Sequence, residues 1–182
     1  MQVALVMTII GQDRPGLVDS VAARVTEHGG NWLESRMSRL GGHFAGILRV
    51  EVPSERERSL VQSLKGLEAQ GLTVVVHSEK GEPLPAGKEL SLLEIVGQDQ
   101  PGIVRQISRV LATYGVNVEE LETERGSAAM SGEMLFKATA KLRIPQSCNV
   151  DELRKQLEKI AEDLIVDISL EPFSAGAASQ LI

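Results

Sequence analysis

Residues 10–18 read Ile-Gly-Gln-Asp-Arg-Pro-Gly-Leu-Val, and residues 96–104 read Val-Gly-Gln-Asp-Gln-Pro-Gly-Ile-Val. The two stretches lie 86 residues apart, and six of their nine positions are identical. The same shift aligns Gly29 with Gly115, Asn31 with Asn117, Glu34 with Glu120 and Gly46 with Gly132. Matches at a constant offset indicate that the chain is an internal repeat.

The repeat divides the 182 residues into two modules, each large enough to fold as a small domain. We expect the first module over residues 1–78 and the second over residues 90–171. Residues 79–89 contain Pro83, Pro85 and several charged residues, which is the composition of a linker. Residues 174–182 are mostly small, and we expect a flexible C-terminal tail over residues 172–182.

Each module has the pattern βαββαβ. Apolar runs and alternating stretches predict the strands Val3–Ile10, Asn31–Leu40, Phe44–Val52 and Leu72–His77, then Leu90–Val96, Asn117–Arg125, Met130–Arg143 and Leu164–Leu170. Apolar residues at helical spacing predict helices around Leu17–Val25, Leu60–Leu67, Pro101–Tyr114 and Leu153–Ile160. We expect Asp13 to cap the first helix, Pro15 to lie in its first turn and Gly29 to end it.

Right-handed crossovers then give an α+β fold of two tandem ferredoxin-like modules. Each module is expected to form an antiparallel four-stranded sheet in the strand order 4-1-3-2, with two helices on one face. The first strand, Val3–Ile10, is apolar on both of its faces, whereas two helices can cover only one face of the sheet. We therefore expect another sheet or a dimer partner on the second face, and a homo-oligomer.

The overall composition disfavours several classes of partner. Lys plus Arg is 19 and Asp plus Glu is 25, which gives a net charge of −6. Direct binding of nucleic acid needs a basic face or stacking aromatics, and aromatic residues make up only 3%. No apolar run approaches the ~20 residues that cross a membrane. The single cysteine is typical of a reducing compartment, so we expect a cytoplasmic protein.

The repeated motif resembles the ACT domain, a small amino-acid-sensing module attached to many metabolic enzymes. The residues that carry the resemblance are Gly-Gln-Asp-x-Pro-Gly-(Leu/Ile)-Val after a first strand and Gly-x-Asn at the start of the second. Two such modules, with the hairpin sequences of residues 34–46 and 131–136, resemble the glycine cleavage system transcriptional repressor family. The two motifs depart from each other at Arg14 and Gln100, so the two candidate sites differ in charge.

The resemblance implies particular partners. It implies a small amino-acid effector, with glycine as the candidate, and action through a protein partner such as a DNA-binding transcriptional activator. That indirect action agrees with the acidic charge. No cofactor is expected, and no metal, because no His or Cys pair has the spacing of metal ligands.

The turn between the first strand and the first helix is a candidate ligand site. It gathers free backbone N–H groups and the positive end of a helix, which together favour a carboxylate such as that of an amino acid. In amino-acid-binding members of the ACT family, the effector lies between this loop and the second strand of a paired module. The resemblance assigns ligand binding to Gly11, Asp13, Pro15, Gly16, Leu17 and Asn31, and to Gly97, Asp99, Pro101, Gly102, Ile103 and Asn117. Asp-x-Pro-Gly is also a good strand-to-helix turn, so a purely structural role stays open.

The predicted second strands carry different charges in the two modules. By period-two alternation and the 86-residue shift, Arg36 takes the place of Glu122 in the row Glu120, Glu122 and Glu124. We expect the two modules, or two chains, to pair edge to edge through these strands, with Arg36 and Arg39 near this glutamate row. A charged face that is simply solvated is the alternative.

No motif in the sequence indicates catalysis. There is no Walker loop, no Gly-x-Ser-x-Gly and no pair of carboxylates placed by a motif. Because the fold uses both modules, no catalytic domain is left over, and we expect a protein that is not an enzyme. The leading prediction is a regulator that senses an amino acid and represses glycine cleavage genes. The alternatives are a regulatory subunit that binds a metabolic enzyme and a small enzyme with an unrecognised site.

Overall fold

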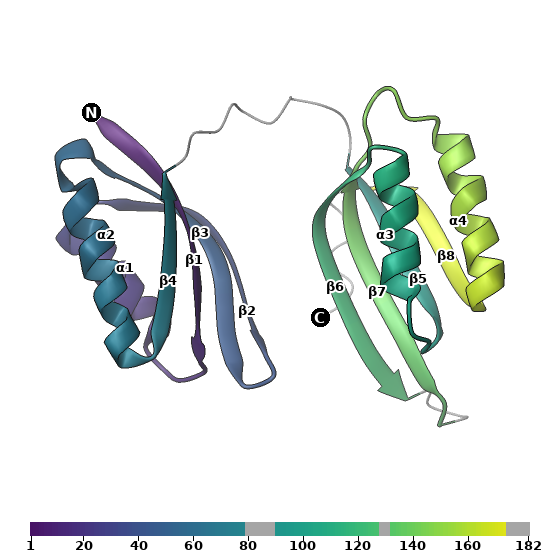
Figure 1. The fold of residues 1–182 in the computed structure, drawn as a ribbon, viewed down its shortest axis with the longest axis horizontal. Coiled ribbons are helices and arrows are strands. Elements are labelled where there is room, and N and C mark those ends of the chain that lie inside the picture. Colours follow the sequence, from purple (N-terminus) through teal and green to yellow (C-terminus); the bar gives the residue numbers. More distant parts are fainter. Residues whose placement is uncertain (79–89, 128–131, 174–182) are drawn as a thin grey trace. The chain divides into compact units, whose positions relative to one another are not determined.

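In the computed structural model, which describes residues 1–78, 90–127 and 132–173, the strands form two antiparallel sheets (Figure 1). The first has the order β2-β3-β1-β4 and consists of β1 (Gln2–Gln12), β2 (Asn31–Leu40), β3 (His43–Pro53) and β4 (Leu72–Ser78). The second has the order β6-β7-β5-β8 and consists of β5 (Leu90–Gln98), β6 (Asn117–Ser127), β7 (Met134–Arg143) and β8 (Val166–Pro172). The predicted α+β class and strand order are confirmed.

The chain divides into two compact units, Met1–Glu82 and Pro83–Ile182, and each contains one sheet. The predicted linker, residues 79–89, lies outside the described residues. So do residues 174–182 of the predicted tail and residues 128–131, which lie between β6 and β7 in the sequence.

Two helices cover one face of each sheet, as predicted (Figure 1). They are α1 (Leu17–Glu27) and α2 (Glu57–Lys65) in the first unit, and α3 (Ile103–Thr113) and α4 (Val150–Leu164) in the second. Short 3₁₀ turns flank α2: η1 (Ser54–Arg56) and η2 (Gly66–Gln70). Within the described ranges, no helix combines the length and the apolar character that membrane crossing requires.

Alternation along the central strands builds one apolar core in each unit. Leu5, Met7 and Ile9 of β1 are buried, as are Leu93 and Ile95 of β5. The helices contribute buried residues at helical spacing: Leu17, Val21 and Val25; Leu60 and Leu64; Ile103, Ile107 and Leu111; Leu153, Leu157 and Leu164. Burial of one such side chain contributes about 1.5–3 kcal/mol, so these contacts hold the helices on their face of the sheet.

The first helix of each unit begins differently from the prediction. Asp13 does not cap α1: the N-cap residue is Gly16, with φ 91°, and no side chain accepts a hydrogen bond there. Gly102 has the same role at α3, with φ 100°. Because the chain enters the helix through a left-handed residue, Pro15 precedes the helix and the motif glycine is the residue that the turn requires.

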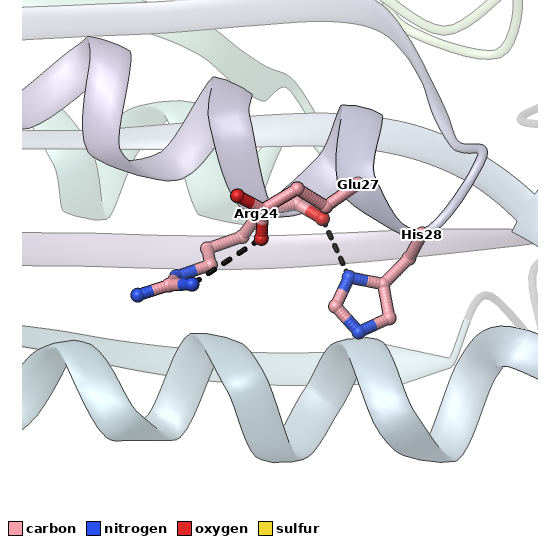
Figure 2. A network of polar contacts seen from close by, with 3 residues as sticks. All are labelled: Arg24, Glu27 and His28. Carbon is pink, nitrogen blue, oxygen red and sulfur yellow. Dashed lines mark hydrogen bonds and ion pairs between the residues drawn. The ribbon is translucent and has the colours of Figure 1, made fainter.

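The end of α1 follows the prediction. Gly29, with φ 69°, donates its N–H to the carbonyl of Thr26 at 2.9 Å. Beside it, Nδ1 of His28 lies 2.7 Å from the carbonyl oxygen of Arg24, and the Arg24 guanidinium lies 3.2 Å from Glu27 (Figure 2). Polar contacts at the last carbonyls and a left-handed glycine together stop the helix before β2.

The two hairpins differ in length, which corrects one part of the repeat alignment. Ile9 pairs with Gly46 in the first sheet, whereas the equivalent Ile95 pairs with Ala138 in the second. The structural equivalent of Gly46 is therefore Ala138 and not Gly132. The offset grows from 86 to 92 residues across the hairpin, because the second hairpin contains six additional residues.

Each sheet has a second face that carries no helix of the described residues, here called its open face (Figure 1). The register places Val6, Thr8, Ile10, Glu34, Arg36, Ser38, Ala45, Ile47, Arg49, Glu51, Thr73, Val75 and His77 on the open face of the first sheet. It places Leu92, Glu94, Val96, Glu120, Glu122, Glu124, Lys137, Thr139, Lys141, Arg143, Asp167, Ser169 and Glu171 on that of the second. Ile10, Ile47 and Val75 are exposed, in keeping with the apolar character of β1 on both faces.

Candidate functional site

The motif turn makes the same polar contacts in both units. The Asp13 carboxylate lies 2.5 Å from the guanidinium of Arg39, and the Asp99 carboxylate lies 2.6 Å from that of Arg125. The backbone N–H of each aspartate also donates to a carbonyl of the neighbouring hairpin, at 2.9 and 3.0 Å. The motif aspartate therefore fastens the turn to the hairpin, which is the physical reason that it does not cap the helix.

Arg14 and Gln100 differ in charge but contact equivalent atoms. The Arg14 guanidinium donates to the carbonyl of Gln70 at 3.0 Å, and the Gln100 side-chain amide donates to the carbonyl of Leu164 at 3.1 Å. Both acceptors lie where the second helical segment of a unit ends, just before its last strand. Position 14 and position 100 thus share one structural role although only the first carries charge.

The first motif glycine is required by packing. A Cβ atom on Gly11 would lie 2.6 Å from the carbonyl oxygen of Gly71, and one on Gly97 would lie 2.6 Å from Cα of Val166. Real Cβ atoms do not approach other atoms so closely, so the turn before the last strand can pack here only against glycine. This role needs no ligand.

A hollow of about 240 Å³ adjoins the start of α1. It is lined by Asp13, Arg14, Gly16, Leu17, Val18, Asp19 and Phe44. The backbone of Gly16 has open space around it, so a small molecule can approach the first turn. A helix N-terminus with a carboxylate and a guanidinium beside it can recognise the two charged ends of an amino acid.

Asn31 does not lie at this hollow in its own unit. Asn31 pairs with Glu51, which in turn pairs with Ala4, whereas the motif turn follows Gln12. Eight residues of strand separate the two levels, which corresponds to roughly 26 Å. The Asn31 amide lies 3.4 Å from the Glu51 carboxylate, and in the second unit the Asn117 amide donates to Glu119 at 2.8 Å.

The charged residues of the edge strands divide between two faces. Arg36 lies on the open face of the first sheet, and its structural equivalent Glu122 lies on that of the second, with Glu120 and Glu124 on either side. Arg39 lies on the opposite face, where it pairs with Asp13. In the second sheet Glu120 is 2.6 Å from the ammonium group of Lys141.

Sequence reasoning did not identify Arg125 or the pairing of each motif aspartate with an arginine. The signal was present, because the 86-residue shift that aligns Asp13 with Asp99 also aligns Arg39 with Arg125. The pairing was not recognised because the aspartate lies in the motif turn and its arginine lies at the far end of the second strand, distant in the sequence. Only the antiparallel register brings those two segments together.

Cys148 lies apart from the motif turns. Its side chain is half-buried and packs against the core of the second unit. Burial raises the pKa of the Cys148 thiol, which keeps it in the less reactive protonated form.

Comparison with known proteins identifies one family and several relatives. The ACT domain family model matches residues 4–77 and again residues 89–171. The glycine cleavage system transcriptional repressor of Escherichia coli (strain K12) is 24% identical over 165 residues, which cover 88% of this chain and 85% of that protein. A UPF0237 protein of Methanopyrus kandleri is 30% identical over 81 residues, which cover 44% of this chain and 84% of that protein. The crystal structure of an unknown protein from Galdieria sulphuraria is similar with a TM-score of 0.85 and 28% identity, covering 96% of this chain and 100% of that one.

Proposed function

Because the chain belongs to the ACT domain family, we propose that it is a regulator whose modules respond to an amino acid. The finer proposal is that it represses glycine cleavage genes, with glycine as effector. The relative from E. coli carries that activity in its name and matches this chain over most of both lengths. The observation that carries the amino-acid response is the motif turn, which is present twice and adjoins a hollow in the first unit.

The proposed ligand site combines the motif turn with an asparagine of another module. The turn contributes Gly11, Asp13, Pro15, Gly16 and Leu17, or Gly97, Asp99, Pro101, Gly102 and Ile103. The asparagine is Asn31 or Asn117. The distance of Asn31 from its own turn supports a site that is completed by a second module, because one module cannot present both parts to one small ligand.

The repressor is proposed to act through a protein partner. Direct binding of DNA needs a basic face, and the chain has a net charge of −6. A DNA-binding activator is the partner that fits this charge. The ligand would have to bind one arrangement of the modules more tightly than another, because equal affinity for both shifts no equilibrium.

Calorimetry of the full chain with each of the twenty amino acids tests the sensing step. We expect one amino acid to bind, and Asn31→Ala or Asn117→Ala to abolish that binding. The matched control is Gln62→Ala, which removes an exposed amide from α2. If no amino acid binds, or if the asparagine variants bind as the wild type does, the proposed site is wrong.

A pull-down from native lysate tests the partner. Capture of a DNA-binding protein, strengthened or weakened by the amino acid, supports the repressor role. Capture of a metabolic enzyme instead would favour a regulatory subunit. A salt-dependent gel shift by the purified chain alone would contradict the indirect mechanism.

A further inference from the structure

The open face of the first sheet has an apolar centre. Ile10 is 51% exposed, Ile47 48% and Val75 46%. Ile47 lies on β3 and Val75 on β4, on either side of the same residue of β1, Thr8. Ile10 and Val6 are the next residues of β1 on that face. Large apolar side chains gathered on an uncovered sheet face are typical of a surface that binds another protein surface.

The fold does not require apolar residues at the centre of the open face. The register of the second sheet places Thr139 where the first sheet has Ile47, and Ser169 where it has Val75. The position of Thr8 is occupied by Glu94. The second sheet keeps apolar residues where the first has Val6 and Ile10, namely Leu92 and Val96, but it is polar at the positions of Thr8, Ile47 and Val75.

Charges of both signs border the apolar centre. Glu34 and Arg36 are neighbours on the open side of β2, and Arg49 and Glu51 are neighbours on the open side of β3. The Arg49 guanidinium lies 3.8 Å from the Glu34 carboxylate. The open sides of β2 and β3 thus carry two acids and two bases, whose formal charges cancel, so a second copy of this face is not repelled by it.

The second sheet could not pair with itself in this way. Its open face carries the acids Glu94, Glu120, Glu122, Glu124, Asp167 and Glu171 and the bases Lys137, Lys141 and Arg143. Acids are in excess, so two copies of this face repel each other.

The size of the first open face fits a sheet-on-sheet contact. Four strands about 4.8 Å apart, with a rise of about 3.3 Å per residue, give a footprint of roughly 19 Å by 30 Å. The resulting area of about 570 Å² is below the about 800 Å² that each partner buries in a standard interface, which places the contact at the small end of specific interfaces. A hollow of about 270 Å³ over Val6 and Ile47, bordered by Glu34, Arg36 and Arg49, offers room for a side chain of the opposing sheet.

We propose that the open face of the first sheet binds the same face of a second copy of the chain. Val6, Ile10, Ile47 and Val75 of the two copies form the centre of the contact. Glu34, Arg36, Arg49 and Glu51 border this contact, and their formal charges cancel. The proposal concerns the assembly alone and does not depend on an amino-acid ligand, so it can fail while the proposed function holds, and the reverse.

Sedimentation velocity of the full chain over a range of concentrations tests the proposal. We expect a dimer whose dissociation constant rises at least about a hundredfold in Ile47→Glu, because a carboxylate at the centre loses its hydration when the two faces meet. Ile47 is half-exposed and lies opposite Arg36, so the variant is expected to fold, which circular dichroism verifies. The matched control is Thr139→Lys, which places a charge opposite Glu122 on the second sheet and should leave the dimer unchanged.

A charge swap on β2 tests whether the balanced charge of this face matters for the dimer. Arg36→Glu alone should weaken the dimer about tenfold, because the open sides of β2 and β3 then carry three acids and one base and two copies repel each other. Adding Glu34→Arg should restore the dimer, because two acids and two bases are present again. A chain that is monomeric at every concentration overturns the proposal. So does a dimer that Ile47→Glu leaves intact, which would place the contact at the strand edges, or one that Thr139→Lys disrupts equally.

Discussion

The two units agree at the motif turn and disagree on the open face. At the turn, the aspartate–arginine pair and the hydrogen bond to the end of the second helical segment occur in both units. On the open face, Ile47 and Val75 of the first sheet correspond to Thr139 and Ser169 of the second. The contacts that build the fold are thus duplicated, whereas the surface that can meet a partner is specific to each unit.

The largest effect on stability is expected where the two units are most alike. Gly11→Ala and Gly97→Ala should each lower the free energy of unfolding of their own unit by about 2–3 kcal/mol, because the new Cβ meets backbone at 2.6 Å. Urea unfolding separates the units: Trp32, the single tryptophan, packs against the first core and reports on that unit, while circular dichroism reports on both.

Gly66→Ala is the control for that pair. Its Cβ meets no atom within 4 Å and its φ is −62°, so the substitution should be neutral or slightly stabilising. Equal losses in Gly11→Ala and Gly66→Ala would contradict the packing argument.

The next largest change in the free energy of unfolding is expected at a position where the two units differ. The residue before the last strand is Gly71 in the first unit and Ile165 in the second, with φ 79° and 53°. Gly71→Ala should destabilise the first unit by about 1–2 kcal/mol, and Ile165→Asn should stabilise the second by about 0.5–1 kcal/mol, because a left-handed backbone penalises most side chains but tolerates asparagine. Urea unfolding measures both changes. A loss of stability in Ile165→Asn would show that the exposed Ile165 side chain makes contacts that outweigh the strain.

A smaller contribution to stability is expected from the aspartate–arginine ion pair that both units contain. Because Arg39 and Arg125 are largely exposed, a double-mutant cycle of Asp13→Asn with Arg39→Gln should give a coupling of about 0.2–1 kcal/mol. The same cycle on Asp99 and Arg125 should give a similar value, and 1 M salt should reduce both. A coupling in only one unit would mean that the two turns are not equivalent.

The smallest effect is expected from Arg14→Gln, which gives the first unit the residue of the second. Gln100 makes the equivalent hydrogen bond, so the free energy of unfolding should change by less than about 0.5 kcal/mol. Calorimetry with the amino acid that the wild type binds gives the second readout. Unchanged stability with lost binding would assign the Arg14 charge to ligand recognition, while a large loss of stability would contradict the shared structural role.

The architecture could be predicted from the sequence because each local sequence signal is consistent with the same overall fold. The duplicated motif, the apolar stripes of the helices and Gly41-Gly42 between two strands all specify the same βαββαβ order. The prediction that Asp13 caps α1 was wrong. A helix after such a turn can begin either at a capping side chain or at a left-handed glycine, and the sequence alone did not show that Asp13 forms an ion pair with Arg39.

The candidate site was harder to predict than the fold. Asn31 and the motif turn belong to one motif in the sequence, but the direction of β2 places them at opposite ends of a sheet. The alignment of Gly46 with Gly132 failed because a constant offset cannot register additional residues in a hairpin. The difference between the open faces became visible only when register assigned Ile47 and Val75 to one surface.

The edge strands β2 and β6 influence how readily each unit aggregates when it is partly unfolded. Each is an outermost strand with one row of backbone N–H and C=O groups facing away from its sheet, which is the template from which fibrils grow. Glu120, Glu122 and Glu124 make β6 a poor template, because an identical strand laid beside it in either direction would bring acid next to acid. On β2 an antiparallel copy can bring Glu34 next to Arg36, so the charges of β2 give less protection. Heat-induced aggregation of this chain should therefore begin at its first unit.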